Sequence, residues 1–60
     1  MTKPVKLEGY IQDDTEFEFG KEGARWFVSC WKGKDFEDCH WYLYFGKETD
    51  ARKEFERWRK

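Results

Sequence analysis

Residues 24–45, ARWFVSCWKGKDFEDCHWYLYF, decide the fold of this chain. Two runs within it, residues 24–32 and 38–45, are rich in aromatic residues and are separated by a charged segment that contains Gly33. Neighbouring residues of a strand point to opposite faces, so each run predicts a strand with one apolar face and one mixed face. The apolar face carries Trp26, Val28, Cys30, Cys39, Trp41, Leu43 and Phe45. The opposite face carries Arg25, Phe27, Ser29, Trp31, His40, Tyr42 and Tyr44.

The pairing of these two strands follows from keeping every apolar side chain on one side of the sheet. In this antiparallel register the two cysteines lie opposite each other. They are then either two reduced core residues, as is usual in the cytoplasm, or a cross-strand disulfide. The expected pairs are Trp26 with Leu43, Val28 with Trp41, and Cys30 with Cys39.

A first hairpin precedes this pair of strands, because apolar and polar residues alternate over residues 5–19. A two-residue turn would pair Ile11 with Glu16 and mix apolar and acidic side chains on one face. A five-residue loop, residues 12–16, instead pairs Ile11 with Phe17 and keeps that face apolar, so we prefer the longer loop. The hairpin then adds to the apolar face Val5, Leu7, Ile11, Phe17 and Phe19.

One helix is expected after the last strand. Ala51, Phe55 and Trp58 recur with the spacing of an amphipathic helix, and Thr49 is a suitable N-cap residue. The sequence therefore predicts an α+β fold of the type ββββα. It consists of a four-stranded antiparallel meander sheet with one C-terminal α-helix packed on one face, in a single small domain over residues 1–60.

The charge balance of the chain argues against a protein that binds nucleic acid or membranes through its net charge. Twelve basic and thirteen acidic residues give a formal net charge of −1, so no overall field steers the chain onto such polyanions. No apolar run approaches the ~18 residues that predict a membrane span. The first residues also lack the apolar stretch of a secretory signal. We therefore expect a cytoplasmic protein that does not bind a membrane.

The residue types needed for metal binding or catalysis are not brought together by the expected strands. Cys30, Cys39 and His40 are the best metal ligands available, but a structural zinc ion takes four ligands in compact pairs. Cys39 and His40 are neighbours in one strand, so their side chains point to opposite faces and form no Cys–His catalytic pair. We expect no enzymatic activity and no metal, cofactor or small-molecule substrate.

Two surfaces remain as candidates for partner binding. The first is the mixed face of the last two strands, where large rings combine with basic side chains, a composition typical of binding hot spots. Its candidate contact residues are Phe27, Trp31, Tyr42, Tyr44, Arg25 and His40, and Tyr10 of the first strand is expected to join them. The second is the acidic first hairpin, with Asp13, Asp14, Glu16 and Glu18.

The leading hypothesis is a small non-catalytic protein-interaction module, an inhibitor or adaptor that occupies the surface of a partner. Compact chains of this style are common among phage-encoded factors that target host or defence proteins. A protein partner or a homo-oligomer is favoured over nucleic acid. A purely structural alternative is that the rings pack on one another, or beneath Lys and Arg side chains, and that the acidic residues only keep the hairpin soluble.

Single-stranded nucleic-acid binding is the alternative function of the mixed face. Bases stack on aromatic side chains, and Arg25, Lys32 and Lys34 would then contact phosphates. In element order and in its aromatic-rich sheet, the chain resembles the Whirly and Pur-type single-stranded nucleic-acid binders. The resemblance implies such a binding mode, but it includes no shared motif, so no residue roles are carried over from these proteins.

Overall fold

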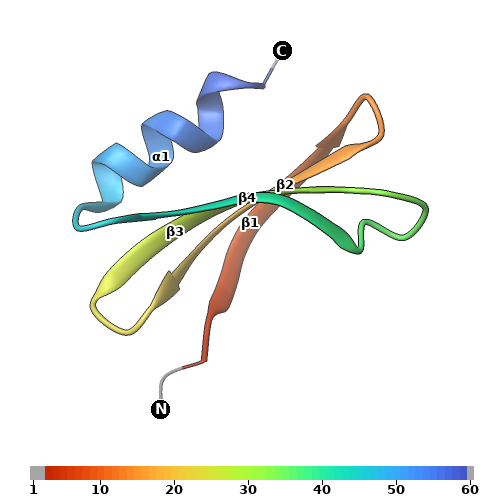
Figure 1. Cartoon of the computed structure of the whole chain (residues 1–60). Coiled ribbons are helices and arrows are strands. Elements are labelled where there is room, and N and C mark those ends of the chain that lie inside the picture. Colours follow the sequence, from red (N-terminus) through yellow and green to blue (C-terminus); the bar gives the residue numbers. More distant parts are fainter. Residues whose placement is uncertain (1–2, 60) are drawn as a thin grey trace.

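A computed structural model describes residues 3–59 and shows four antiparallel strands followed by one helix (Figure 1). The strands pair in the order β1-β2-β3-β4, and α1 packs on one face of this sheet. The predicted ββββα meander is confirmed. We call the two sides of the sheet the helix face and the open face. The elements are β1 (Val5–Gln12), β2 (Thr15–Glu22), β3 (Arg25–Lys32), β4 (Asp38–Phe45) and α1 (Glu48–Arg57).

The core lies between α1 and the helix face of the two central strands. Phe19 and Val28 are completely buried there, and Ala51 and Phe55 of α1 cover them. The rings of Phe19 and Phe55 lie 5.6 Å apart, so the helix is anchored by an aromatic contact at the middle of the sheet. Within residues 3–59, α1 is too short and too polar to cross a membrane.

The first hairpin differs from our prediction, because β1 and β2 are joined by a two-residue turn. Asp13 and Asp14 have φ angles of 52° and 61°, the left-handed pair typical of a type I′ turn, whose twist matches that of the flanking strands. Ile11 therefore pairs with Glu16 on the open face and is 60% exposed. The prediction of a five-residue loop is wrong, since the turn geometry and the packing of Tyr10 outweigh the burial of Ile11.

Tyr10 lies on the helix face and not on the open face, which corrects a second prediction. Its ring stacks on Phe17 at 5.0 Å, and its hydroxyl donates a hydrogen bond of 2.7 Å to the carbonyl of Phe55. This carbonyl belongs to the last turn of α1, where backbone acceptors lack partners within the helix. Gln12 donates a similar bond to the carbonyl of Trp58, and Glu8 forms an ion pair with Arg52. Polar side chains of β1 thus hold the helix in place.

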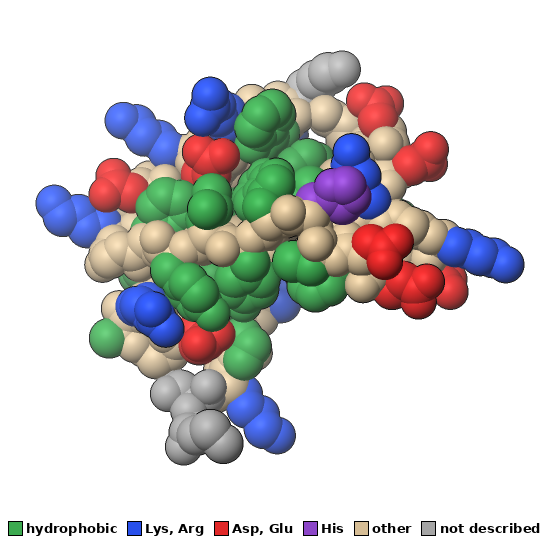
Figure 2. Space-filling model, in the orientation of Figure 1, with side chains coloured by type: hydrophobic (Ala, Val, Ile, Leu, Met, Phe, Trp, Pro, Cys, Tyr) green, Lys and Arg blue, Asp and Glu red, His purple; other side chains and the backbone are tan. Residues whose placement is uncertain are grey.

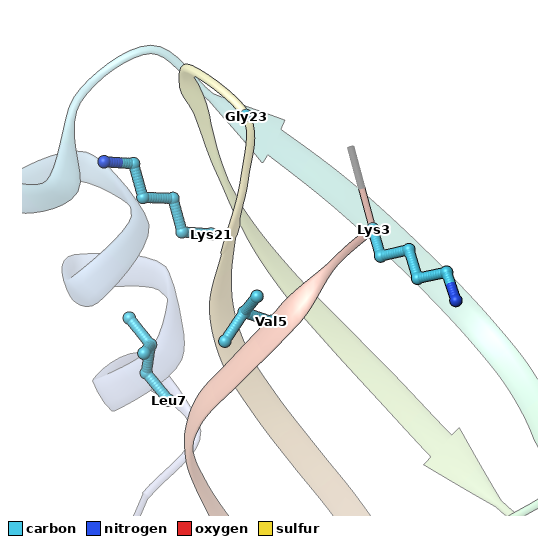
Figure 3. Close-up of a pocket in the computed structure, with 5 residues that line it drawn as sticks. All are labelled: Lys3, Val5, Leu7, Lys21 and Gly23. Atoms are coloured by element: carbon cyan, nitrogen blue, oxygen red, sulfur yellow. The ribbon is translucent and has the colours of Figure 1, made fainter. Parts of the chain in front are cut away.

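The start of β1 is left without cover. A bulge between Lys6 and Glu8 interrupts the pairing with β2. Val5 and Leu7 extend to the side of α1, as Figure 3 shows, but the helix lies over β2, β3 and β4 and does not reach them. Both side chains are more than half exposed, so our expectation that they belong to the core is wrong. With Lys3, Lys21 and Gly23 they line a shallow pocket of about 370 Å³.

The register between β3 and β4 is shifted by two residues from the expected one. Trp26 pairs with Phe45, Val28 with Leu43 and Cys30 with Trp41. A two-residue shift leaves every side chain of these pairs on its predicted face, because the strand repeat is two. One residue of the shift is already present where Lys32 pairs with Asp38 across the connecting loop, in which Phe36 has a left-handed φ of 53° and donates a backbone hydrogen bond to Gly33. The other enters between the pairs Trp31–Cys39 and Cys30–Trp41.

The cysteines are consequently not opposite each other. An irregularity in β4 beside His40 leaves Cys39 opposite Trp31, where it is exposed, while Cys30 is buried in the core. Both thiols are free, so neither the cross-strand disulfide nor a buried Cys39 is found. The helix also begins at Glu48 and not after Thr49, with Lys47 as the N-cap residue and no side-chain cap.

Candidate functional site

The open face of the sheet brings together the rings expected from the sequence. Phe27, Trp31, Tyr42 and Tyr44 lie on it together with Arg25. Figure 2 shows hydrophobic side chains at the surface on both sides of the sheet, with charged side chains around them. Figure 1 shows that no helix lies over the open side. The rings therefore form a surface and not a second core.

A pocket of about 320 Å³ is the main feature of this surface. We call it the open-face pocket. Its floor is Phe27, which is only 3% exposed and stacks on the ring of Tyr42 at 5.1 Å between centroids. Trp31 and Tyr42 are half-buried and form its aromatic walls. The complete lining is Pro4, Lys6, Glu18, Phe27, Trp31 and Tyr42.

Gly20 provides the seat for the floor of the open-face pocket. A Cβ atom at this position would lie 2.1 Å from the carbonyl oxygen of Val5 and 2.5 Å from Cζ of Phe27. Real Cβ atoms do not approach other atoms so closely, and the Val5 oxygen is backbone that cannot move aside. The absence of a side chain at Gly20 therefore lets the ring of Phe27 approach β2 closely, as glycine allows where other groups come near the backbone.

A chain of hydrogen bonds fixes the polar wall of the open-face pocket. The indole Nε1 of Trp31 donates to Oγ of Ser29 at 2.9 Å, and this hydroxyl donates to Oε1 of Glu18 at 3.4 Å. Ser29 is completely buried between them. The carboxylate of Glu18 also forms an ion pair with the ammonium of Lys6, with 3.2 Å between Oε2 and Nζ. The orientation of both Trp31 and Glu18 is thus set before any ligand arrives.

The protonation states on the open face follow from these contacts. Hydrogen bonding to Glu18, together with the charges of Glu16 and Glu18, raises the pKa of Lys6, so its ammonium stays charged. Burial, followed by the neighbouring Tyr44 and Glu22, raises the pKa of Tyr42 to about 12. Tyr42 therefore presents a neutral hydroxyl and an intact aromatic face at neutral pH.

Tyr44 stands beside the pocket in a different environment. The guanidinium of Arg25 lies 4.1 Å from the centre of its ring, and its hydroxyl donates to Oε1 of Glu22 at 3.3 Å. Arg25 is also 3.8 Å from the carboxylate of Glu22. The ring of Tyr44, the carboxylate of Glu22 and the guanidinium of Arg25 thus contact one another, and the guanidinium already covers one face of the Tyr44 ring.

The remaining predicted site residues lie in different parts of the structure, and only some of them are next to these rings. His40 is exposed, and the strand alternation that placed it on the same face is interrupted beside it. Asp13 and Asp14 form the exposed turn of the first hairpin. Glu16 and Glu18 are half-buried on the open face and share Lys6 between them. The acidic surface and the aromatic surface are therefore adjacent parts of one face.

Sequence reasoning missed the roles of Lys6, Gly20 and Ser29. The apolar alternation that predicts the first hairpin stops at Phe19, whereas β2 continues through Gly20 to Glu22 and the chain turns at Gly23, which has a φ of 63°. The alternation Glu16, Glu18, Gly20 is the signal that could have revealed a strand position without a side chain, opposite a large ring. The ion pairs of Lys6 depend on the register between β1 and β2, and no pattern in the sequence indicated them separately.

Residues 3–59 contain no group of three His, Cys, Asp or Glu side chains arranged to hold a metal ion. Burial raises the pKa of the Cys30 thiol, which keeps it in its unreactive protonated form. Comparisons of the chain with protein-family models, with curated proteins and with solved structures find no match. The open-face pocket is therefore interpreted from its own geometry.

Proposed function

We propose that this protein is a small protein-interaction module that acts as an inhibitor or adaptor by covering the surface of a partner with its open face. The observation that carries the proposal is the open-face pocket. Two half-buried rings, Trp31 and Tyr42, line it on a side of the sheet that no helix covers. Tyr, Trp and Arg are the residues that most often supply binding energy at the centre of protein interfaces.

The edges of the sheet support binding through a face. Both outer strands are irregular: β1 has a bulge between Lys6 and Glu8, and the β3–β4 pairing is interrupted between Cys30 and Trp31. Bulges in edge strands disfavour the addition of a further strand. A partner that docks on the rings is therefore favoured over one that extends the sheet.

The charges of the open face favour a protein over single-stranded nucleic acid. Arg25 lies over Tyr44 on the open face, whereas Lys32 lines a pocket on the helix face with Cys30 and Trp41. The basic residues expected to contact phosphates are thus divided between two faces. Three carboxylates also stand beside the rings and would repel a phosphate backbone; they are Glu16, Glu18 and Glu22.

The proposal is tested with alanine variants and a matched control on the other side of the molecule. The immobilised protein captures partners from a lysate of its source cells, and captured proteins are quantified by mass spectrometry. Sedimentation velocity measures self-association in parallel, so a second copy of the chain would also be recognised as the partner. Trp31→Ala and Tyr42→Ala are compared with Trp58→Ala, which removes an exposed indole at the end of α1.

We expect Trp31→Ala and Tyr42→Ala each to weaken the specific partner about tenfold or more, the equivalent of roughly 1.4 kcal/mol. Trp58→Ala should leave binding unchanged. Partner binding and self-association that are equal in all four proteins would show that the open face is not the contact surface.

A further inference from the structure

The aromatic rings of residues 3–59 differ in one respect: a Lys or Arg of the chain lies over some of them and not over others. Five rings have a Lys or Arg group within 5.3 Å of their centres; they are Tyr10, Phe19, Trp26, Tyr44 and Trp58. Trp31 and Tyr42, the walls of the open-face pocket, carry no such cation among residues 3–59. A cation placed over an aromatic ring is attracted by the negative face of the ring.

We infer that the open-face pocket receives a cationic side chain, arginine or lysine, which the partner inserts between Trp31, Tyr42 and the carboxylate of Glu18. This inference rests on the proposed function, because the side chain belongs to a protein partner. The neighbouring group of Tyr44, Glu22 and Arg25 shows the same combination of ring, carboxylate and cation already completed within the chain.

The charges around the open-face pocket leave room for one more cation. Glu16 and Glu18 both contact the single ammonium of Lys6, at 3.4 Å and 3.2 Å. Two carboxylates and one ammonium leave one negative charge beside the rings. Lys6 itself approaches the carboxylates and does not lie over either ring wall. An incoming cation therefore meets two carboxylates that share one ammonium and, in the same pocket, two rings over which no Lys or Arg of residues 3–59 lies.

The open-face pocket is also preorganised for this ligand. The buried hydroxyl of Ser29 joins the indole of Trp31 to the carboxylate of Glu18, so neither group must be ordered when the ligand binds. Groups held in their bound orientation lose less conformational entropy on binding. The pocket volume of about 320 Å³ is at the lower end of the roughly 300–1,000 Å³ range of ligand sites, which suits one inserted side chain.

The test is an NMR titration of the ¹⁵N-labelled protein with four capped tripeptides. Their central residue is arginine, lysine, norleucine or glutamate, so norleucine provides a neutral chain of similar length. The indole N–H signal of Trp31 reports on the pocket directly. We expect arginine and lysine peptides to bind saturably and glutamate to cause no shift. Norleucine should bind at least about tenfold more weakly than the cations. Added salt should weaken the binding of the cations, since part of the attraction is electrostatic.

Three charge-removing variants identify the carboxylate that matters. Glu18→Gln keeps an oxygen that accepts the bond from Ser29 but removes the charge, and it should weaken the arginine peptide about tenfold. Glu16→Gln removes the other carboxylate that contacts Lys6, so it also cancels the excess negative charge; it should weaken the arginine peptide less than Glu18→Gln does, because Glu16 does not line the pocket. Glu22→Gln makes the same charge change on the same face, beside Tyr44 and away from the pocket lining. Glu22→Gln should bind the arginine peptide within about twofold of the original protein.

Equal binding of norleucine and arginine would overturn the inference, as would an unchanged affinity in Glu18→Gln or the absence of binding by both cationic peptides. Each of these results leaves the proposed function intact if Trp31→Ala weakens capture of the partner about tenfold or more. Conversely, saturable binding of arginine by a protein whose capture is indifferent to Trp31→Ala would support the pocket chemistry and contradict the protein-interaction role.

Discussion

The two faces of the sheet are both rich in aromatic residues, but they use their rings differently. On the helix face, Phe19 and Phe55 are buried against aliphatic and aromatic neighbours, and their role is to exclude water. On the open face, the rings alternate with carboxylates, Lys6 and a buried serine that satisfy one another while Trp31 and Tyr42 remain half-exposed. Aromatic content alone therefore does not distinguish a core from a binding surface; the polar groups between the rings do.

The largest effect expected from this comparison is the loss of Phe55. Phe55→Ala removes a ring that is 1% exposed and leaves a cavity beneath α1, which typically costs about 3–5 kcal/mol. A domain of this size rarely has more than about 3–5 kcal/mol of stability. We expect the variant to be largely unfolded at 25 °C, with no cooperative transition in urea followed by circular dichroism.

Tyr44→Ala is the matched removal of a ring from the open face. Tyr44 is 43% exposed, so its loss should lower the free energy of unfolding by about 1 kcal/mol or less. Phe55→Leu, which preserves most of the volume, should remain folded and allows a measurable comparison at about 1–1.5 kcal/mol. A larger loss in Tyr44→Ala than in Phe55→Leu would mean that the open face contributes to stability as a core does.

The second effect concerns how the floor of the open-face pocket is built. Gly20→Ala forces a Cβ atom against the backbone of Val5 and the ring of Phe27, and such overpacking costs about 1–3 kcal/mol. We expect a lower urea midpoint and a shift of the Trp31 indole N–H signal, because the floor must move.

Gly46→Ala is the control for this substitution. A Cβ at Gly46 meets no atom within 4 Å, so the change should be neutral or slightly stabilising through a less flexible unfolded chain. If both glycine variants had the same stability, the close approach of Phe27 to β2 would not be required for folding.

The fold and the faces of β3 and β4 could be predicted from the sequence because alternation is insensitive to an even shift in register. Trp26, Val28 and Cys30 stayed on the helix face although their partners differ by two residues from those expected. The β bulge beside His40 could not be predicted in this way, since alternation does not show where one extra residue enters a strand. Cys39 left the predicted face for this reason.

The candidate site was predictable only in its rings. Phe27, Trp31 and Tyr42 follow from alternation within two strands, whereas the polar wall needs the pairing of β1, β2 and β3 together. Our preference for a longer first turn rested on burying Ile11, and the short aspartate turn outweighed that single contact. Tyr10 was misplaced because an amphipathic ring fits either face; its bond to the helix carbonyl decides between them.

The dependence of stability on alkaline pH should distinguish the partly buried tyrosines on the two faces of the sheet. Tyr42 keeps its proton in the folded protein until its raised pKa of about 12, whereas the unfolded chain loses it near pH 10. Above pH 10 the unfolded state therefore binds fewer protons than the folded state, and stability falls as pH rises, by at most about 1.4 kcal/mol per pH unit for one group. Urea midpoints measured from pH 9 to pH 11.5 should show this decline.

Tyr42→Phe should remove the open-face part of the alkaline decline and leave the part due to Tyr10. Burial also raises the pKa of Tyr10, and its ionisation would remove the proton that it donates to the carbonyl of Phe55. Tyr10→Phe should therefore remove the helix-face part, and the double variant should keep only the decline due to other groups with raised pKa values, such as Cys30 and Lys6. An identical alkaline slope in the original protein and both variants would contradict the assignment of buried phenols on the two faces.

The smallest expected effect is the difference between one ion pair on each face. Glu8 and Arg52 approach to 2.7 Å on the helix face, yet both side chains are nearly half exposed, so water competes with the pair. Lys6 and Glu18 are slightly farther apart at 3.2 Å, but Glu18 is only 21% exposed and accepts a further bond from Ser29. Exposed pairs contribute about 0–1 kcal/mol, and partial burial of one carboxylate moves a pair towards the upper part of that range.

Double-mutant cycles to alanine should therefore give a larger coupling energy for Lys6–Glu18 than for the shorter Glu8–Arg52 pair. The opposite order would mean that distance, and not the local exposure of the carboxylate, decides the strength of these pairs.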